Sequence, residues 1–251
     1  DRAVAVKTLH FEDQASFEGQ LHEASVLFQL RNSKNIVQLI GFCNTTMVLE
    51  YAPTTLEQLL FGTREEISVR RALALGLDAV KGIEQLHSVT GGPVVHCDLK
   101  LDSYLVHPDG RLLLSDFNFA HYSGLDKSGN KCQFESTRMS VSPDWCLFCA
   151  PEEHLDQQLG EKIDIYRVAL VLWSLLARVP HQEHIPYCAG DCSASVLAGK
   201  RPDMTLLRDY PLEMQELIVE AWDGDPKKRP TASDMVKRIE GIIQNYDGAH
   251  S

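Results

Sequence analysis

The chain has 251 residues, of which 44% are hydrophobic, and it carries a formal net charge of −11. This is enough apolar material for one large domain, or for two lobes around a cleft. The acidic balance excludes the basic surface that nucleic-acid binding needs, so no nucleic-acid partner is expected. The longest apolar run, residues 168–177, is too short to span a bilayer, so no transmembrane segment is expected.

The first 52 residues are predicted to form three strands and one helix. Short apolar or alternating runs indicate the strands, and apolar residues spaced three and four apart indicate the helix. In chain order the predicted elements are a strand at 3–8, a helix at 14–30, and strands at 36–43 and 46–51. Residues 53–55 are predicted to be a hinge, so residues 1–52 are expected to be a small N-terminal lobe.

The remainder, residues 53–251, is predicted to be a larger and mainly helical C-terminal lobe. One predicted helix has a single apolar face, whereas the next is apolar nearly all round, which is typical of a helix in the middle of a lobe. The last begins near Thr231, with Asp234 in the position of a capping-box glutamate. The predicted helices are 68–88, 164–178, 213–222 and 231–245. The pattern therefore predicts an α+β fold.

Two short segments place acidic residues directly after apolar runs. His96-Cys97-Asp98-Leu99-Lys100 follows Pro93-Val94-Val95, and Asp116-Phe117-Asn118 comes shortly after Leu112-Leu113-Leu114. Two carboxylates, with a lysine two residues after the first, suit phosphoryl transfer. One can accept a hydroxyl proton, the other can hold Mg²⁺, and the lysine can face the transferred phosphate. The plainer interpretation is a loop aspartate that accepts backbone N–H groups.

Five motifs in order resemble those of the eukaryotic protein kinase domain. Val4-Ala5-Val6-Lys7 resembles V-A-I-K, His96 to Lys100 resembles H-R-D-L-K, Asp116 to Asn118 resembles D-F-G, Ala150-Pro151-Glu152 is A-P-E, and Ala221 to Thr231 is similar to the end of tyrosine-kinase-like domains. The resemblance implies a two-lobed kinase fold. It also implies transfer of the ATP γ-phosphate to serine or threonine hydroxyls of a protein substrate, with ATP and Mg²⁺ as cofactors.

The resemblance also implies a role for each charged residue. Lys7, paired with Glu23, would hold the ATP phosphates, and Asp98 would be the catalytic base. Lys100 would steady the transferred group, and Asp116 would bind Mg²⁺.

The nucleotide's adenine ring is expected between Ala5 and Leu105. The hinge backbone from Glu50 to Ala52 would bond the adenine edge, and Leu49 would be the gatekeeper. Packing in the core is the plainer explanation for each of these positions, and both explanations can hold together.

Several positions depart from the family pattern. Ser103 replaces an asparagine that binds the second metal, so it is a candidate metal and nucleotide ligand with a shorter reach. Cys97 replaces an arginine that reads a loop phosphate, which predicts activity independent of phosphorylation there. Asn118 replaces a glycine, a mild change because asparagine tolerates positive φ. Trp145 replaces a threonine near the substrate-docking floor. Glu152 and Arg229 resemble the family's buried ion pair.

The family's glycine-rich loop precedes the lysine strand and does not occur in this sequence, where Lys7 is the seventh residue. The chain could be a fragment, or the loop could be absent. A pseudokinase that binds nucleotide or acts as a scaffold is the alternative function. A secretory-pathway glycan kinase is a third, because residues 46–51, 148–152 and 161–165 are similar to the O-mannose kinase.

The seven cysteines leave several states open. Cys146 and Cys149, with Cys188 and Cys192, could form a zinc site, disulfides or reduced thiols. A cytoplasmic location is favoured, and a secretory lumen is compatible with the cysteine count. The sequence does not indicate the substrate, the pathway or the oligomeric state.

Overall fold

The computed structural model describes residues 3–8, 14–43, 45–63, 66–130, 132, 148–155, 158–179 and 192–249, with the backbone alone for 14–17. The strands are β1 Val4–Thr8, β2 Leu39–Cys43, β3 Thr46–Glu50, β4 Thr54–Thr55, β5 Val94–Val95, β6 Tyr104–Val106, β7 Leu112–Leu114 and β8 His121–Tyr122. The α-helices are α1 Gln14–Gln29, α2 Leu56–Phe61, α3 Val69–His87, α4 Lys162–Ala177, α5 Cys192–Leu197, α6 Leu212–Ala221 and α7 Ala232–Ala249. Short 3₁₀ helices lie at Leu101–Ser103, Pro151–His154 and Met204–Leu207.

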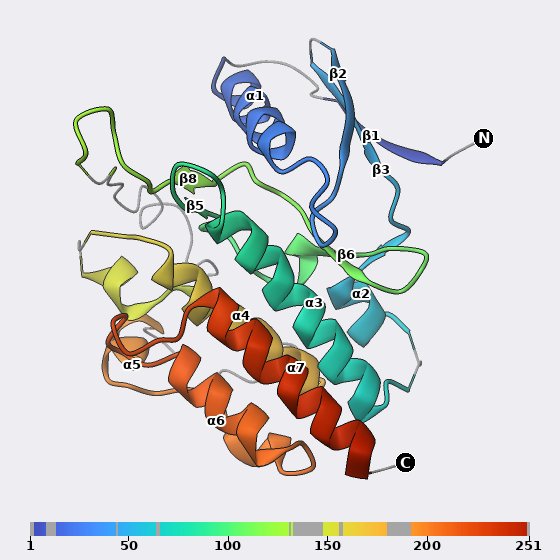
Figure 1. Cartoon of the computed structure of the whole chain (residues 1–251), viewed down its shortest axis with the longest axis vertical. Coiled ribbons are helices and arrows are strands. Elements are labelled where there is room, and N and C mark those ends of the chain that lie inside the picture. The colour runs from blue at the N-terminus through green and yellow to red at the C-terminus, as the bar shows by residue number, and fades with distance from the viewer. Residues whose placement is uncertain are drawn as a thin grey trace.

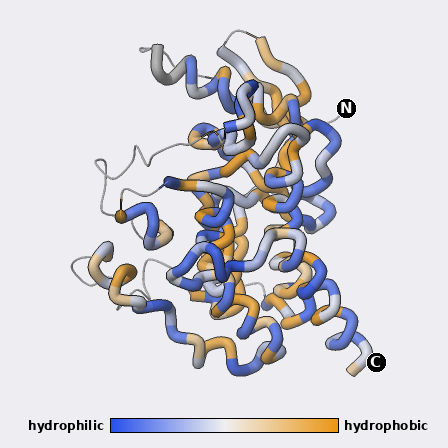
Figure 2. The backbone as a smooth tube through the Cα atoms, turned by 60° about the vertical axis from the view of Figure 1, so that its left-hand side comes forward, coloured by the Kyte–Doolittle hydropathy of each residue, from blue (hydrophilic) through white to orange (hydrophobic). Residues whose placement is uncertain are grey.

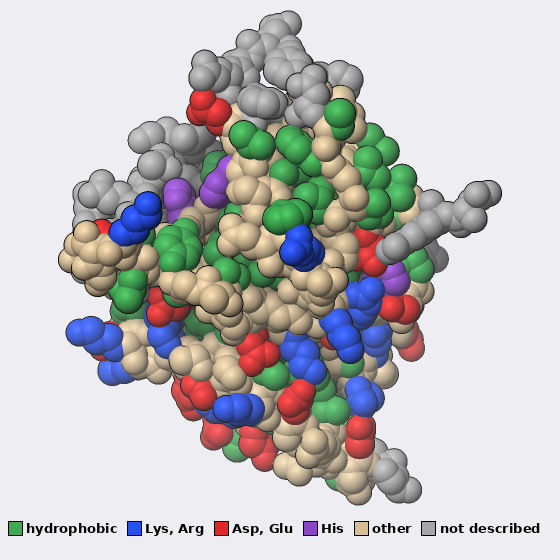
Figure 3. Space-filling view, turned by 45° about the horizontal axis from the view of Figure 1, so that its top comes forward, with side chains coloured by type: hydrophobic (Ala, Val, Ile, Leu, Met, Phe, Trp, Pro, Cys, Tyr) green, Lys and Arg blue, Asp and Glu red, His purple; other side chains and the backbone are tan. Residues whose placement is uncertain are grey.

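The structure confirms the predicted α+β fold, with a small sheet region first and a helical region after it (Figure 1). The N-terminal sheet has the order β1-β3-β2 and is antiparallel. Side chains alternate along β1, so Ala5 and Lys7 lie on one face and Val4 and Val6 on the other. Val4 and Val6 are exposed. Figure 3 shows hydrophobic side chains gathered in the upper part of the face that it presents.

The core of the helical region lies around α4, which is buried along nearly its whole length, as its apolar sequence predicts. α3 packs against both α4 and α7. It turns its apolar stripe inward, including Leu73, Val80 and Ile83, while Ser68 caps its first turn by accepting from the backbone N–H of Arg71. Figure 2 shows the hydrophobic segments running through the interior of this region.

A short loop after α1 ties the two regions together. The side-chain amide of Asn35 donates to Asp78 Oδ1 on α3 at 3.1 Å and to the Leu112 carbonyl at 3.2 Å. Asp78 Oδ2 in turn accepts from the backbone N–H of Leu112 at 3.1 Å. Burial, the largest influence, raises the pKa of Asp78, although these hydrogen bonds act to lower it. The loop therefore fixes α1 relative to α3 and to the strand that precedes Asp116.

The strands β4, β6 and β8 and the short helices were not predicted, because elements this short show no hydrophobic period. The strands β5 and β7 coincide with the apolar runs at 93–95 and 112–114, where the sequence left strand and loop open. The predicted hinge at residues 53–55 contains β4, which pairs with β6. The domain boundary at residue 52 stays a prediction. In the part of the chain that the structure describes, no helix has the length and apolarity to cross a bilayer.

Candidate functional site

The lysine strand and α1 meet through an ion pair. Lys7 Nζ lies 2.6 Å from Glu23 Oε2, and the Glu23 side chain is only 2% exposed whereas that of Lys7 is 40% exposed. Gln20, on the preceding turn of α1, donates to the Lys7 carbonyl at 3.3 Å. Glu23 therefore fixes the Lys7 ammonium beside the inner face of the sheet. This is the partner expected from the resemblance.

A buried carboxylate, to which no sequence motif pointed, holds the loop of residues 96–100 that carries Asp98. Asp164, in the first turn of α4, accepts the backbone N–H of His96 at 2.8 Å and that of Cys97 at 3.1 Å. His87 Nε2 lies 2.9 Å from the same carboxylate. Burial, the largest influence, would raise the pKa of Asp164, but the hydrogen bonds and charges of His87 and His96 together outweigh it, and the pKa is lowered.

Asp164 stabilises an unusual backbone at the loop. Cys97 has a φ of 63°, in the left-handed region that costs a non-glycine residue about 1–3 kcal/mol when held there. The two N–H groups on Asp164 fix this turn, and Asp98 follows it directly. His96 is fixed as well, because its Nε2 lies 2.9 Å from the Ser115 carbonyl and its Nδ1 accepts from the Asp98 N–H at 3.2 Å. These contacts assign the ring proton to Nε2.

Asp98 and Asp116 both act electrostatically on Lys100. Burial, the largest influence on Lys100, lowers its pKa. The hydrogen bond and charge of Asp102, and the charges of Asp98 and Asp116, outweigh burial and raise the pKa of Lys100. Lys100 Nζ lies 3.1 Å from Asp102 Oδ2, in a half-exposed pair. The charges of both acids that the sequence singles out therefore reach Lys100.

Asp116 lies at the end of β7 in a left-handed conformation, with a φ of 66°. Asn118 Nδ2 donates to Asp116 Oδ1 at 2.7 Å. Phe117 is fully buried, with its ring centroid 5.1 Å from that of His96. The positive φ falls on Asp116 and not on Asn118, so the backbone at Asn118 does not need a glycine, and the Asn118 side chain orients the Asp116 carboxylate.

Ser103 is fully buried and bonds to the loop backbone. Its hydroxyl donates to the Asp98 carbonyl at 2.8 Å and accepts from the Lys100 N–H at 3.3 Å. Its own carbonyl accepts from the backbone N–H of Ser115 at 2.9 Å and from the Ser115 hydroxyl at 3.0 Å. The serine therefore ties the loop that carries Asp98 to the end of β7, beside Asp116. Its role as a metal and nucleotide ligand stays a prediction.

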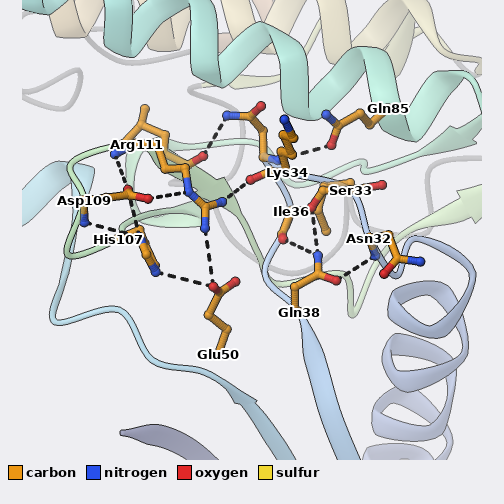
Figure 4. Close-up of polar contacts among 12 residues, drawn as sticks. Asn32, Ser33, Lys34, Ile36, Gln38, Glu50, Gln85, His107, Asp109 and Arg111 are labelled. Atoms are coloured by element: carbon orange, nitrogen blue, oxygen red, sulfur yellow. Dashed lines mark hydrogen bonds and ion pairs between the residues drawn. The ribbon is translucent and has the colours of Figure 1, made fainter. Parts of the chain in front are cut away.

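The side chain of Glu50, at the end of β3, makes polar contacts with other residues of the chain (Figure 4). Glu50 Oε1 lies 3.4 Å from both His107 Nε2 and Arg111 Nη2, and Arg111 also donates to the Lys34 carbonyl and, at 2.9 Å, to Asp109 Oδ2. The backbone N–H of Glu50 donates to the Gln38 carbonyl at 2.9 Å. This network anchors the end of β3 to the hairpin between β6 and β7.

The remaining predicted nucleotide contacts are partly buried. Ala5 pairs with Leu49 across β1 and β3, on the same face as Lys7. Leu105 lies on β6, where it pairs with Thr55, and packs against the core, while Ala52 follows β3. Contact of Ala5, Leu105, Glu50 and Ala52 with adenine stays a prediction.

Two adjacent glutamates in the 3₁₀ helix at Pro151–His154 form separate buried ion pairs. Glu152 receives two bonds from Arg229, at 2.6 and 2.7 Å, which confirms the expected pair. Glu153 pairs with Arg167 on α4, with Nη2 to Oε1 at 2.6 Å, and this pair was not predicted. The available signal was an arginine inside the apolar helix, because a buried charge requires a partner. Trp145 lies outside the described residues.

The cysteines do not support the zinc interpretation. Cys192 is in a disulfide bond, so its sulfur is not a zinc thiolate. Cys43, Cys97, Cys132 and Cys149 are not in disulfides, and Cys146 and Cys188 lie outside the described residues. Within the described ranges, no group of three or more His, Cys, Asp or Glu side chains could hold a metal ion.

Comparison with known proteins identifies the family. Residues 1–239 match the model for "Protein tyrosine and serine/threonine kinase". The chain belongs to this protein kinase family. Similar proteins include integrin-linked protein kinase 1 of Arabidopsis thaliana, 27% identical over 96% of this chain and 51% of that protein. Serine/threonine-protein kinase 12 of the same plant is 28% identical over 96% of this chain and 52% of its own length.

A third relative is the dual specificity protein kinase shkD of Dictyostelium discoideum, which is 28% identical over 88% of this chain and 29% of its own length. The chain thus spans about half, or less, of the length of these relatives. Kinases of both serine/threonine and dual specificity are therefore among its relatives.

Proposed function

We propose that this kinase-family chain transfers the γ-phosphate of ATP to serine or threonine hydroxyls of a protein substrate. The observation that supports this most strongly is the ion pair between Lys7 and Glu23, together with the electrostatic cluster of Asp98, Lys100 and Asp116. An ammonium, a base and a metal-binding acid are the charged groups that phosphoryl transfer needs. The name of one of these relatives, serine/threonine-protein kinase 12, supports serine and threonine as acceptors.

Each residue would have a separate task. Asp98 would accept the hydrogen bond of the acceptor hydroxyl and take its proton as the new oxygen–phosphorus bond forms, while the bond from the γ-phosphorus to the bridging oxygen breaks and ADP leaves. Lys100 would face the transferred phosphoryl group, and Lys7, held by Glu23, would bind the phosphates of ATP. The half-exposed Lys100–Asp102 pair is weak enough for Lys100 to exchange Asp102 for a phosphate.

Magnesium fits the donor set around Asp116. Magnesium prefers oxygen ligands and commonly uses one or two carboxylates together with substrate phosphates. Among the described residues, the one hydrogen bond that the Asp116 carboxylate accepts is that from Asn118, to Oδ1. When bound, the ion would neutralise charge on the phosphate oxygens. Asn118 would keep the carboxylate oriented.

Ser103 favours a second candidate function, that of a pseudokinase. Its hydroxyl is fully buried and bonds to backbone groups of Asp98 and Lys100. A second metal would then lack a protein ligand at this position. In that case the domain would bind nucleotide and transfer phosphate poorly.

The test is phosphate transfer from labelled ATP, with Mg²⁺, to a library of peptides containing serine, threonine or tyrosine. Wild type is compared with Asp98→Ala and Lys7→Met, and with Asp247→Ala, an exposed aspartate at the end of α7, as a matched control. We expect transfer to serine or threonine peptides by wild type and by Asp247→Ala alone. Incorporation equal to that of Asp98→Ala would overturn the proposal. Nucleotide-dependent thermal stabilisation without transfer would establish the pseudokinase instead.

A further inference from the structure

Two residues of α4, three positions apart, bind two different segments: the loop that carries Asp98 and the segment at Cys149 to Glu153. Asp164 binds the backbone N–H groups of His96 and Cys97, and Arg167 binds Glu153. Residues three apart lie on the same side of a helix. A single rigid and deeply buried element therefore sets the position of both segments.

The Glu153–Arg167 pair is built as an internal anchor. Both side chains are 4% exposed, with Arg167 Nη2 to Glu153 Oε1 at 2.6 Å and Arg167 Nε to Glu153 Oε2 at 3.2 Å. Glu153 Oε2 also accepts the backbone N–H of Ala150 at 2.7 Å, and Arg167 Nη2 lies 3.5 Å from Cys149 Sγ. The guanidinium thus binds Glu153 in a planar, two-pronged arrangement and contacts Cys149, while Glu153 binds the backbone of Ala150.

The same guanidinium lies within electrostatic reach of the catalytic base candidate. Burial, the largest influence on Arg167, lowers its pKa, but the charges of Glu153, Cys149 and Asp98 outweigh it and raise the pKa. The charge of Asp98 therefore reaches Arg167, which lies one helical turn after Asp164, the residue that binds the backbone just before Asp98.

Residue 97, directly before Asp98, provides no cation that could bind a phosphate group. Cys97 is buried, and its thiol lies 3.5 Å from the Val95 carbonyl, to which it donates. A phosphate on the segment between Asp116 and Glu152 would therefore find no cationic partner at residue 97. Arg167 is too deeply buried to receive one without losing Glu153.

We propose that Glu153–Arg167 is a permanent positioning pair, which holds the segment at Cys149 to Glu153 on the same helix that holds the loop before Asp98, and makes acceptor docking independent of phosphate on the preceding segment. The proposal rests on the kinase function proposed above. Arg167 acts through Glu153 and does not touch the reacting groups. The ion pair would position the segment at all times, whereas a cation that binds a phosphate group would do so only after phosphorylation.

The kinetic test compares wild type with Arg167→Gln, Arg167→Lys and Glu153→Gln, using the library peptide that is phosphorylated fastest. We expect the KM for peptide to rise by about tenfold or more in the two glutamine variants, because docking geometry is lost. The KM for ATP should stay within about twofold, and Arg167→Lys should recover part of the loss. Phosphatase treatment should leave the wild-type rate unchanged. Equal changes in both KM values, or loss of the wild-type rate after phosphatase treatment, would overturn the proposal.

A second measurement does not need turnover. Amide hydrogen exchange is followed in residues 148–155 and in residues 94–98, with Arg238→Gln as the control because it breaks the exposed pair with Glu220. In Arg167→Gln we expect faster exchange in 148–155 and unchanged exchange in 94–98. Unchanged exchange in 148–155, or equal acceleration in both, would refute the positioning role. If wild type transfers no phosphate, the proposed function fails and this measurement alone decides whether the pair anchors the segment.

Discussion

The buried pair between Glu152 and Arg229 gives the sharpest stability prediction. Glu152→Gln keeps the size and one acceptor of the side chain but removes its charge. The Arg229 side chain is 0% exposed and Glu152 is 4% exposed, so no water replaces the lost partner. Arg229 would still donate to the carbonyls of Asp223 and Lys162, at 2.8 Å each. Its charge would remain buried and uncompensated.

The size of the expected stability loss follows from the burial of the pair. Breaking one partner of a buried ion pair destabilises a protein by about 3–5 kcal/mol, and the remaining hydrogen bonds place this variant near the lower value. With a urea slope of about 3 kcal/mol/M for a chain of this size, the unfolding midpoint should fall by about 1 M. The matched control is Glu220→Gln, whose partner Arg238 is exposed. That change should cost about 0.2–1 kcal/mol, a shift of at most about 0.3 M.

The assay is urea unfolding followed by circular dichroism for wild type and both variants. A slope m that stays constant across the three proteins would show that the midpoint reports stability. Equal midpoint shifts for the buried and exposed glutamates would refute the reasoning, since burial is the property that distinguishes them.

Three further predictions concern the loop and the cysteines. Ser103→Asn should raise the transfer rate about ten- to a hundredfold if a missing metal ligand limits it, because the amide NH₂ can donate to the Asp98 carbonyl while the amide oxygen stays available to a metal ion. An unchanged rate in labelled-ATP assays would count against this. The Asp164 carboxyl has a lowered pKa in the folded protein, so its stabilising effect is present above its unfolded pKa and is lost as pH falls through the folded value. His87→Leu removes one of the two groups that lower this pKa, so acid unfolding followed by circular dichroism should begin at a higher pH than in wild type, and an identical acid midpoint would contradict it. The disulfide at Cys192 uses two of the seven cysteines. A thiol titration of the denatured, unreduced protein should therefore count about five thiols, and about seven after reduction. A count of about seven before reduction would show that no disulfide forms.

The long elements could be predicted because hydrophobic period fixes them. The helix predicted at 68–88 is Val69–His87, and the one predicted at 164–178 is Lys162–Ala177. The strands β4, β6 and β8 could not be predicted, since pairing partners far along the chain define them. Ile36 shows this limit, because it was assigned to a strand and forms only an isolated bridge to Leu114.

The site was predictable where a motif names a residue and its partner, as for Lys7 with Glu23. The groups that hold the site were not found in this way. Asp164 and Arg167 lie in an apolar helix, and their partners are backbone N–H groups and a glutamate that no local pattern connects to them. The role of Ser103 also depended on three-dimensional contacts, because its sequence position alone does not show that its hydroxyl bonds to the loop backbone.

The most direct test of the central claim is a crystal structure of this chain with Mg²⁺ and a non-hydrolysable ATP analogue. The account predicts that Lys7 Nζ contacts the phosphates, that an Asp116 oxygen binds Mg²⁺, and that Asp98 lies next to the γ-phosphate. A nucleotide bound elsewhere, or bound between the two regions with Asp116 still turned to Asn118 and no metal present, would contradict it.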